Sequence, residues 1–336
     1  MLLAAATGSL IGLAGCSSGR STAPATTPAP STSPPPSSSP SPSAPSVLST
    51  SAPAAPGAAL PATTPWLPGP GEIDPDVKLR AVQLVEAIGA WPAGGGGVPA
   101  AQSRVSALGL DPGLAGQAGP LLPSADRAAL QVIDAQYGGI LADSASVLVV
   151  CDQWTGAANG PVTAGGTTVD VRLSSAQPRW TVTALHPAEP GAPATQLTTP
   201  AQQVLAETRI QLPPAAHADI ISGAVHDSVL QAMLTLARTY SFSVSVVRSG
   251  HPLDVFGTTR PSDHPLGRAF DVWRIDGRTV VDPGTPTALA DGFMRAAAAA
   301  GSYNVGGPRL LSGGTTANQF FSDNTHHDHV HVGFLT

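Results

Sequence analysis

The sequence predicts an α+β protein in which helices are interleaved with short strands and the C-terminal part carries a small antiparallel sheet. Several longer segments place apolar residues at helical spacing, whereas shorter segments alternate apolar with polar residues. Asp276-Gly277 separates two alternating segments and is typical of a two-residue hairpin turn between antiparallel strands. These patterns indicate two folded domains, at residues 72–195 and 200–336.

The domain expected at 72–195 is a small α+β unit with no assigned role. Apolar residues at helical spacing predict a helix over 75–91. Ser124 is a suitable N-cap for a second helix that continues through Gly138. The Gly-, Pro- and Ala-rich residues 92–120 are expected to form a loop. Alternation then predicts three antiparallel strands, at 146–151, 167–173 and 180–185.

The domain expected at 200–336 should contain the remaining regular structure. Helices are predicted at 226–240 and 287–300, and Gly301 ends the second of them. Strands are predicted by alternation at 242–246, 269–275, 279–281 and 329–334. This order describes an α+β domain with a small antiparallel sheet.

The first residues have the character of an export signal. Residues 1–15 are mostly small and apolar, too few to span a bilayer permanently but suited to the hydrophobic region of a signal peptide. Leu13-Ala14-Gly15-Cys16 resembles the lipobox of bacterial lipoproteins, in which cleavage frees the cysteine for lipid attachment. We therefore expect a signal peptide at 1–15, a lipid anchor at Cys16 and a position on the extracytoplasmic face of the cell membrane.

Residues 16–71 should form a tether after the anchor. The segment consists almost entirely of Ser, Thr, Pro, Ala and Gly, and Arg20 is its only charged residue. Such a composition cannot bury enough apolar surface to offset the entropy of ordering, so we expect a disordered, extended chain. The tether could place a domain within the cell wall, or it could be a plain linker.

Composition excludes several classes of function. The formal net charge of −6 and the pI near 5.8 argue against nucleic-acid binding, which favours a basic surface. Lys78 is the sole lysine of the sequence, and this count argues against a Ser-x-x-Lys acyl-enzyme, a phosphate-binding loop with its lysine, and a Schiff base. Cys16 and Cys151 are too few for a disulfide framework or a cysteine-rich zinc site, and we expect Cys151 to be a buried thiol.

The histidines indicate a metal site near the C-terminus. Most of the nine histidines follow residue 250, and neutral imidazole together with carboxylate suits zinc. His264 and Asp271 flank a Pro/Gly turn and could converge on one ion, whereas His329 and His331 are two residues apart on a strand and should share a face. Three protein ligands and an open position for water would form a catalytic zinc site. His251 could line a pocket or lie on the surface.

Two motifs carry a family resemblance, and they read Ser262-x-His264-x-x-Gly267-x-Ala269-x-Asp271 and His329-x-His331. They resemble the zinc D-alanyl-D-alanine carboxypeptidases and related peptidoglycan peptidases of the Hedgehog/DD-peptidase fold. The resemblance covers about residues 205–336 and implies this fold, Zn²⁺ as cofactor and peptidoglycan peptides as partners. Carried over to this chain, it implies His264, Asp271 and His331 as the zinc ligands.

The resemblance leaves two candidates for the general base. The carboxypeptidase branch uses a Glu three residues before the last histidine ligand, and Asp328 occupies that position here. The lysostaphin-like branch uses the first histidine of His-x-His, which is His329. Strand alternation favours His329, because Asp328 would point to the opposite face unless it precedes the strand. Arg248 matches an arginine that in this family contacts the substrate and the developing oxyanion.

The sequence therefore predicts a lipid-anchored, monomeric zinc peptidase that hydrolyses stem or cross-link peptides of peptidoglycan at the cell envelope. The alternative is a catalytically inactive lipoprotein that keeps this fold and binds wall peptides or a partner, because the general base departs from the carboxypeptidase pattern. If the activity is present, residues 72–195 could supply specificity or regulation.

Overall fold

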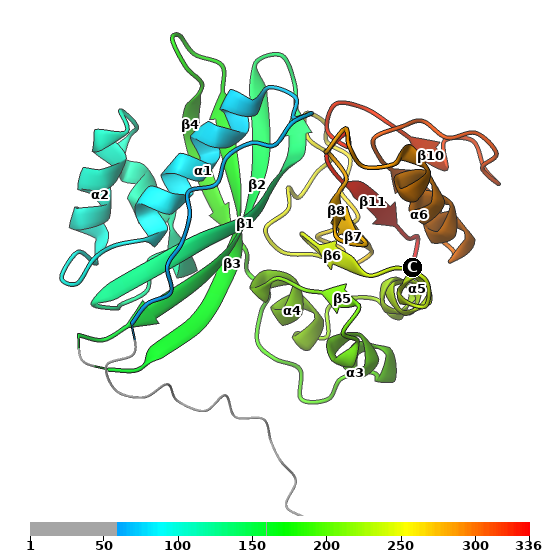
Figure 1. Ribbon diagram of the computed structural model, residues 1–336, viewed down its shortest axis with the longest axis horizontal. Coiled ribbons are helices and arrows are strands. Elements are labelled where there is room, and N and C mark those ends of the chain that lie inside the picture. Colours follow the sequence, from blue (N-terminus) through cyan, green and yellow to red (C-terminus); the bar gives the residue numbers. More distant parts are fainter. Residues whose placement is uncertain (1–58, 159) are drawn as a thin grey trace, which may run out of the picture. The chain divides into compact units, whose positions relative to one another are not determined.

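The computed structural model of the protein describes residues 59–158 and 160–336 (Figure 1). The predicted signal peptide, the lipid anchor at Cys16 and most of the predicted tether lie outside the described residues. All described residues belong to one compact unit. This unit contains two hydrophobic cores, one formed by residues within 77–185 and the other by residues within 201–334. The fold is mixed α+β, with two largely antiparallel sheets.

The N-terminal half is a four-stranded antiparallel sheet whose strands follow one another in chain order. These strands are β1 (Arg127–Ile140), β2 (Ser144–Gly156), β3 (Val162–Ser174) and β4 (Thr181–Pro187). The helical elements of this half are α1 (Pro75–Gly89), α2 (Val98–Ala107) and the 3₁₀ helices η1 (Pro112–Gln117) and η2 (Gly119–Leu121). Helix α1 crosses one face of the sheet and buries Val77, Leu84 and Ile88 (Figure 1).

Strand β1 replaces the second helix expected in this half, so the prediction of a helix from Ser124 through Gly138 is wrong. Leu130 and Val132 alternate with more exposed neighbours, as in a strand. A β-bulge between Val132 and Asp134 then inserts one residue into the ladder. The next buried residue after Val132 is therefore Ala135, three positions later. A spacing of three between buried residues is also typical of a helix.

The remaining predictions for this half have mixed outcomes. The helix predicted at 75–91 and the three strands predicted at 146–151, 167–173 and 180–185 are confirmed. The loop predicted over 92–120 is wrong, because it contains α2 and both 3₁₀ helices. Ala101 and Val105 lie one turn apart on α2 and are fully buried, so small residues suffice to hold this helix in the core.

The C-terminal half is a second sheet with strand order β10-β9-β11-β7-β6-β5 and with β8 paired to β7. Its strands are β5 (Ile210–Gln211), β6 (Phe242–Val244), β7 (Ala269–Ile275), β8 (Arg278–Thr279), β9 (Asn304–Gly306), β10 (Phe320–Phe321) and β11 (Val330–Gly333). Its helices are α3 (Thr199–Ala206), α4 (Pro214–Ile221), α5 (Asp227–Ala237) and α6 (Thr287–Ala299). The pairs β5–β6 and β9–β10 are parallel, and the other pairs are antiparallel.

Most predictions for the C-terminal half are confirmed. The helices predicted at 226–240 and 287–300 are α5 and α6, and the terminal strand is β11. Asp276 and Gly277 form the turn between β7 and β8, and both have positive φ, at 47° and 79°. A two-residue turn of this kind matches the twist of the flanking strands, which explains why the Asp-Gly signal was reliable.

The end of the predicted tether is ordered against the N-terminal half. Residues 59–71 lack helix or strand, but the main-chain N–H of Thr64 donates to Oε1 of Gln131 at 3.0 Å. The N–H of Trp66 likewise donates to Oε1 of Glu86 at 2.9 Å. These residues therefore differ from the disordered tether that their composition predicts, because their backbone bonds to side chains of the folded part.

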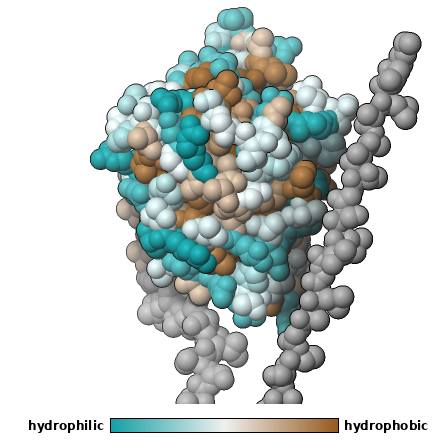
Figure 2. Space-filling view, turned by 90° about the vertical axis from the view of Figure 1, so that its right-hand side faces the viewer, coloured by the Kyte–Doolittle hydropathy of each residue, from teal (hydrophilic) through white to brown (hydrophobic). Residues whose placement is uncertain are grey.

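Neither described range, 59–158 or 160–336, contains a helix with the length and apolar character needed to cross a membrane. Figure 2 looks onto the side of the molecule that lies at the right in Figure 1, where the C-terminal sheet and α6 are found. Hydrophilic and hydrophobic residues are interspersed on the part of this face that the structure describes.

Candidate metal centre

Two neighbouring strands bring an acidic side chain and an imidazole to one face of the C-terminal sheet. In the antiparallel pair of β7 and β11, Asp271 lies directly opposite His331. Residues paired in this way project to the same face of the sheet. Nδ1 of His331 lies 3.0 Å from Oδ1 of Asp271, so the ladder itself brings the two groups together.

His264 reaches the same point from the turn that precedes β7. The N–H of Gly267 donates to the carbonyl of His264 at 2.8 Å and closes this turn. Gly267 has a φ of +71°, and a Cβ there would lie 2.0 Å from the carbonyl oxygen of Ala224, so the turn requires glycine. Nε2 of His264 consequently lies 3.1 Å from Oδ1 of Asp271 and 3.1 Å from Nδ1 of His331.

Hydrogen bonding determines which nitrogen of His264 can act as a ligand. Nδ1 lies 2.9 Å from the carbonyl oxygen of Val247, and because a carbonyl only accepts, Nδ1 carries the hydrogen. Nε2 is then the nitrogen of His264 that is turned toward the carboxylate of Asp271. At metal sites a histidine commonly donates one ring N–H to a carbonyl oxygen, and its other ring nitrogen faces the metal. His264 has the same arrangement of its two ring nitrogens.

The donor set fits zinc. Two imidazole nitrogens and one carboxylate oxygen converge from side chains that are buried, with exposed fractions of 0% for His264, 1% for Asp271 and 8% for His331. Tetrahedral zinc with bonds of about 2.0–2.1 Å places its ligands about 3.3 Å apart. The three separations of 3.0 to 3.1 Å are close to that value. Three protein ligands also leave one position for water or substrate.

The protonation states suit ligation as well. Burial alone would raise the pKa of Asp271, but the imidazoles of His264 and His329 hold this pKa well below its ordinary value. Burial lowers the pKa of His331 to about 4, against the opposing effect of Asp271. At neutral pH, Asp271 is therefore ionised and His331 is neutral, and metal ligands must be deprotonated in this way.

A cavity of about 600 Å³ adjoins the cluster and is lined by His264, His331 and His329. Its size is within the range of small-molecule and peptide sites. His251 also lines this cavity, and its ring stacks on that of His264 with the centroids 4.1 Å apart. His251, His264 and Asp271 offer ligand atoms that all lie within 4.8 Å of one another, so this group could also hold a metal ion.

His329, the favoured general base, lies beside the three candidate ligands. Its Nε2 is 3.6 Å from Oδ2 of Asp271, and its Nδ1 is 2.6 Å from Oδ1 of Asp328. Because an ionised carboxylate only accepts, Nδ1 carries a hydrogen and Nε2 faces Asp271. Burial disfavours the charged ring, but Asp271 and Asp328 raise the pKa of His329 above its ordinary value.

Asp328, the second candidate for the base, is engaged away from the cluster. Its Oδ2 accepts a hydrogen bond from the N–H of Tyr137 at 3.0 Å and lies 2.6 Å from Nζ of Lys78. Burial alone would raise the pKa of Asp328, but Lys78 and His329 hold it well below its ordinary value. Oδ1 of Asp328 is thus placed to orient the ring of His329. Oδ2 is bonded to Tyr137 and Lys78 of the N-terminal half.

A second group of potential ligands, Glu72, His327 and Asp328, lies nearby. The ammonium of Lys78 lies among them, in ion pairs with Glu72 and Asp328. Burial alone would lower the pKa of Lys78, but these two carboxylates raise it above its ordinary value. Lys78 is fully buried and supplies the positive charge that a metal ion would bring, so we assign no metal to this group.

Arg248, predicted to contact substrate, does not line the cavity beside His264 and His331. It lines an adjoining cavity of about 880 Å³, where its Nη1 is 3.3 Å from the carbonyl oxygen of Pro190 and 3.8 Å from Oδ1 of Asp219. The two cavities share His251 as a wall. Arg260 is the arginine that lines the cavity beside His264 and His331. The role of Arg248 stays a prediction, and it requires a substrate that extends into both cavities.

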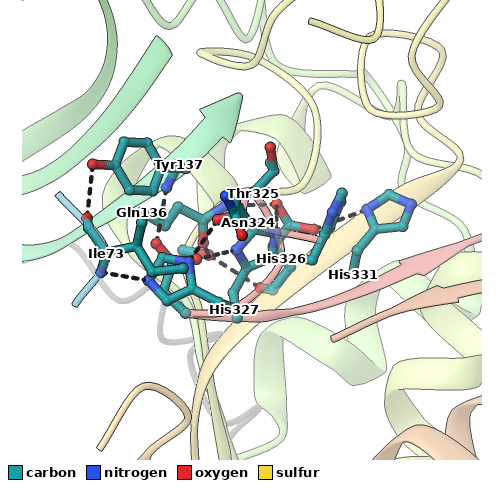
Figure 3. Close-up of polar contacts among 12 residues, drawn as sticks. Ile73, Gln136, Tyr137, Asn324, Thr325, His326, His327 and His331 are labelled. Carbon is teal, nitrogen blue, oxygen red and sulfur yellow. Dashed lines mark hydrogen bonds and ion pairs between the residues drawn. The ribbon is translucent and has the colours of Figure 1, made fainter. Parts of the chain in front are cut away.

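Sequence reasoning did not find the contribution of the N-terminal half. Gln136 and Tyr137 belong to the segment that was expected to be a helix, and a helix would give no reason to place them near the C-terminal histidines. Figure 3 shows both residues beside the segment Asn324–His327, with His327 bonded to the main chain of Ile73. The one available signal was Lys78, since a sole lysine in an apolar helical pattern must find buried partners.

Three comparisons with known proteins were made for this chain. Neither the protein-family models, nor the curated proteins, nor the solved structures contain a match to it.

Proposed function

We propose that the protein is a zinc peptidase of the bacterial cell envelope that hydrolyses stem or cross-link peptides of peptidoglycan. The observation that carries the proposal is the convergence of His264, Asp271 and His331 at the wall of a cavity, with three separations near those of tetrahedral zinc. The resemblance of the motifs to the D-alanyl-D-alanine carboxypeptidases supports the substrate class and a Hedgehog/DD-peptidase fold for the C-terminal half.

The candidate residues divide the work of hydrolysis among them. Zinc held by His264, Asp271 and His331 would polarise the scissile carbonyl and lower the pKa of a bound water. Nε2 of His329 accepts the proton of the attacking water and returns it to the leaving amine. Asp328 keeps Nδ1 of His329 protonated and stabilises the imidazolium that forms, because its carboxylate lies 2.6 Å away.

Two arginines are available for the charged groups of a wall peptide. Arg260 is exposed and lines the metal cavity, and Arg248 lines the adjoining one. A guanidinium binds a carboxylate or an oxyanion through charge-assisted hydrogen bonds. A peptide lying across both cavities would therefore place its reacting carbonyl near the zinc ligands and a carboxylate near either arginine.

The cellular location is part of the same proposal. Lipidation of Cys16 would anchor the chain on the outer face of the cell membrane, and the tether up to residue 58 would allow the folded part to reach the wall. Replacing Cys16 by Ser should release the protein from the membrane fraction and abolish labelling by radioactive palmitate. Retention of the label in Cys16→Ser would contradict the anchor.

A second candidate function is peptide binding without turnover. The observation that favours it is the position of Asp328, where the carboxypeptidase branch has its glutamate base: Oδ2 of Asp328 is engaged by Lys78 and by the N–H of Tyr137. Such a protein would bind zinc and wall peptides and would release no products. Digestion of muropeptides by the zinc-loaded protein separates the two functions.

The test combines zinc analysis with digestion of purified muropeptides by the chain, by His264→Ala and by a control, His217→Ala. His217 is exposed on α4 and has no contact with the cluster. We expect the native protein and His217→Ala to contain one zinc per chain and to cleave the muropeptides. His264→Ala should contain no zinc and should release no products. Absence of zinc from the native protein, or equal products from His264→Ala, would refute the proposal.

A further inference from the structure

Strand β1 of the N-terminal half reaches the metal cluster of the C-terminal half. Nε2 of Gln136 donates a hydrogen bond of 2.6 Å to Oδ2 of Asp271, and Gln136 has an exposed fraction of only 1%. The other oxygen of Asp271, Oδ1, faces His264 and His331. Gln136 therefore determines which oxygen of Asp271 is free to act as a ligand.

The amide of Gln136 has only one orientation that satisfies its partners. Because the carboxylate of Asp271 only accepts, it must face the amide nitrogen of Gln136, and Oε1 of Gln136 then accepts from the hydroxyl of Ser245. Ser245 is in turn fixed by its own N–H, which donates to the carbonyl of Asp271 at 3.0 Å. Gln136 is thus held on both sides by the C-terminal half.

Close backbone packing keeps this part of β1 in place. A Cβ added at Gly139 would lie 2.1 Å from Cβ of Phe256, and one added at Gly138 would lie 3.1 Å from Cδ of Pro252. Phe256 lines the cavity beside the candidate ligands, and Pro252 lines the adjoining cavity. The adjacent N–H of Tyr137 also donates to Asp328 at 3.0 Å, so two successive residues of β1 bond to residues around the cluster.

We propose that Gln136 is a positioning residue for the metal centre, and that the site is completed by the N-terminal half rather than contained in residues 200–336. This inference rests on the proposed zinc site, and it assigns the N-terminal sheet a function in holding the metal. Hydrogen bonds to ligating carboxylates fix the ligand's orientation, and their loss lowers metal affinity by about 10- to 100-fold.

The test measures zinc affinity by competition with a chromophoric chelator, using the full chain, Gln136→Met and a matched control, Gln153→Met. Gln153 is a buried glutamine of the same sheet, and its amide donates only to the carbonyls of Gly89 and Leu121, far from the cluster in the N-terminal core. We expect the zinc Kd of Gln136→Met to rise at least 10-fold and that of Gln153→Met to stay within about twofold. Cobalt substitution adds a second signal, because a reoriented Asp271 changes the d–d bands of Co²⁺.

Zinc affinity requires no turnover, so the result for Gln136 stands even if no wall peptide is cleaved and the peptidase proposal fails. Equal Kd values for the native protein and Gln136→Met, or an equal rise in both variants, would overturn the positioning role. If Gln136→Met does not fold, Ser245→Ala replaces it, because this change frees the amide while leaving Gln136 in place. Ser245→Ala should then raise the Kd in the same direction, and an unchanged Kd would again overturn the inference.

Discussion

Nζ of Lys78 lies 2.6 Å from Oδ2 of Asp328, although the two residues belong to different halves of the chain. Oδ1 of the same carboxylate lies 2.6 Å from Nδ1 of His329. The ammonium on α1 is therefore linked through one carboxylate to the imidazole proposed as general base. This relationship allows changes in the N-terminal half to be tested by their effect on the C-terminal site.

Zinc should stabilise the folded protein through Asp271. Because the three candidate ligands are assembled only in the folded chain, a zinc concentration of about 1,000 times Kd adds about 4 kcal/mol to the free energy of unfolding. Chelation should lower the melting temperature of the native protein, and zinc should restore it. Asp271→Ala should show no response to either treatment, whereas Asp143→Asn, in the exposed turn between β1 and β2, should respond like the native protein. An equal response from Asp271→Ala would exclude Asp271 as a ligand.

His329→Ala should separate catalysis from metal binding. Loss of a general base lowers kcat by about 10² to 10⁴, while the three ligands remain to bind zinc. Asp328→Asn should lower kcat less, because Asp328 acts through the ring of His329. Steady-state kinetics on a muropeptide and zinc analysis of the same samples check both expectations. A larger loss in Asp328→Asn than in His329→Ala, at equal zinc content, would instead favour Asp328 as the base.

Lys78→Met should destabilise the protein strongly. The change leaves Glu72 and Asp328 as buried carboxylates without their cation, and breaking a buried pair in this way costs about 3–5 kcal/mol. The double variant Lys78→Met/Asp328→Asn removes one charge of each sign and should recover part of that loss. Denaturant unfolding of the native protein, Lys78→Met, Asp328→Asn and the double variant measures the coupling. Additive effects of the two substitutions would show that the pair contributes nothing.

Asp134 should make stability fall as pH rises. Oδ2 of Asp134 is buried and has no hydrogen-bond partner among the described residues, and burial raises the pKa of this carboxyl to about 7 despite Lys78. The unfolded chain releases the proton near pH 3.8, so the folded state binds more protons between pH 3.8 and 7. The contribution of Asp134 to the free energy of unfolding is fully present below pH 3.8 and is lost as the pH rises through 7. The loss amounts to at most about 4 kcal/mol, from about 1.4 kcal/mol per unit.

Asp134→Asn should remove this dependence and gain stability relative to the native protein above pH 7. Denaturant unfolding at pH 5 and pH 8.5 checks it, with Asp143→Asn as the exposed control. Parallel stability curves for the native protein and Asp134→Asn would contradict the expectation.

The C-terminal half could be predicted well because its signals are local. Asp276 and Gly277 define a turn by their own backbone preferences, and the helices at 226–240 and 287–300 show unbroken apolar faces. His264 and Asp271 are likewise close in sequence, so the turn between them is sufficient to bring them together. His331 joins them through the register of β7 and β11, which the alternation of the terminal strand anticipates in part.

The N-terminal contribution could not be predicted because it depends on a bulge and on contacts between distant segments. The extra residue after Val132 gives β1 an apolar spacing that resembles that of a helix. A helix at this position gives no reason to place Gln136 near the C-terminal histidines. The partners of Gln136, Ser245 and Asp271, lie more than a hundred residues away. No spacing within one segment encodes such a contact, because its partners come from different halves of the chain.

The burial of Lys78 has a consequence for the chemistry of the protein's surface. Lys78 is the only lysine in the sequence, and its side chain is fully enclosed. The folded part described by the structure therefore presents no lysine amine to acetylating enzymes, to isopeptide-forming transpeptidases or to amine-reactive cross-linkers. Attachment of this protein to other molecules through a lysine side chain would first require the N-terminal half to open.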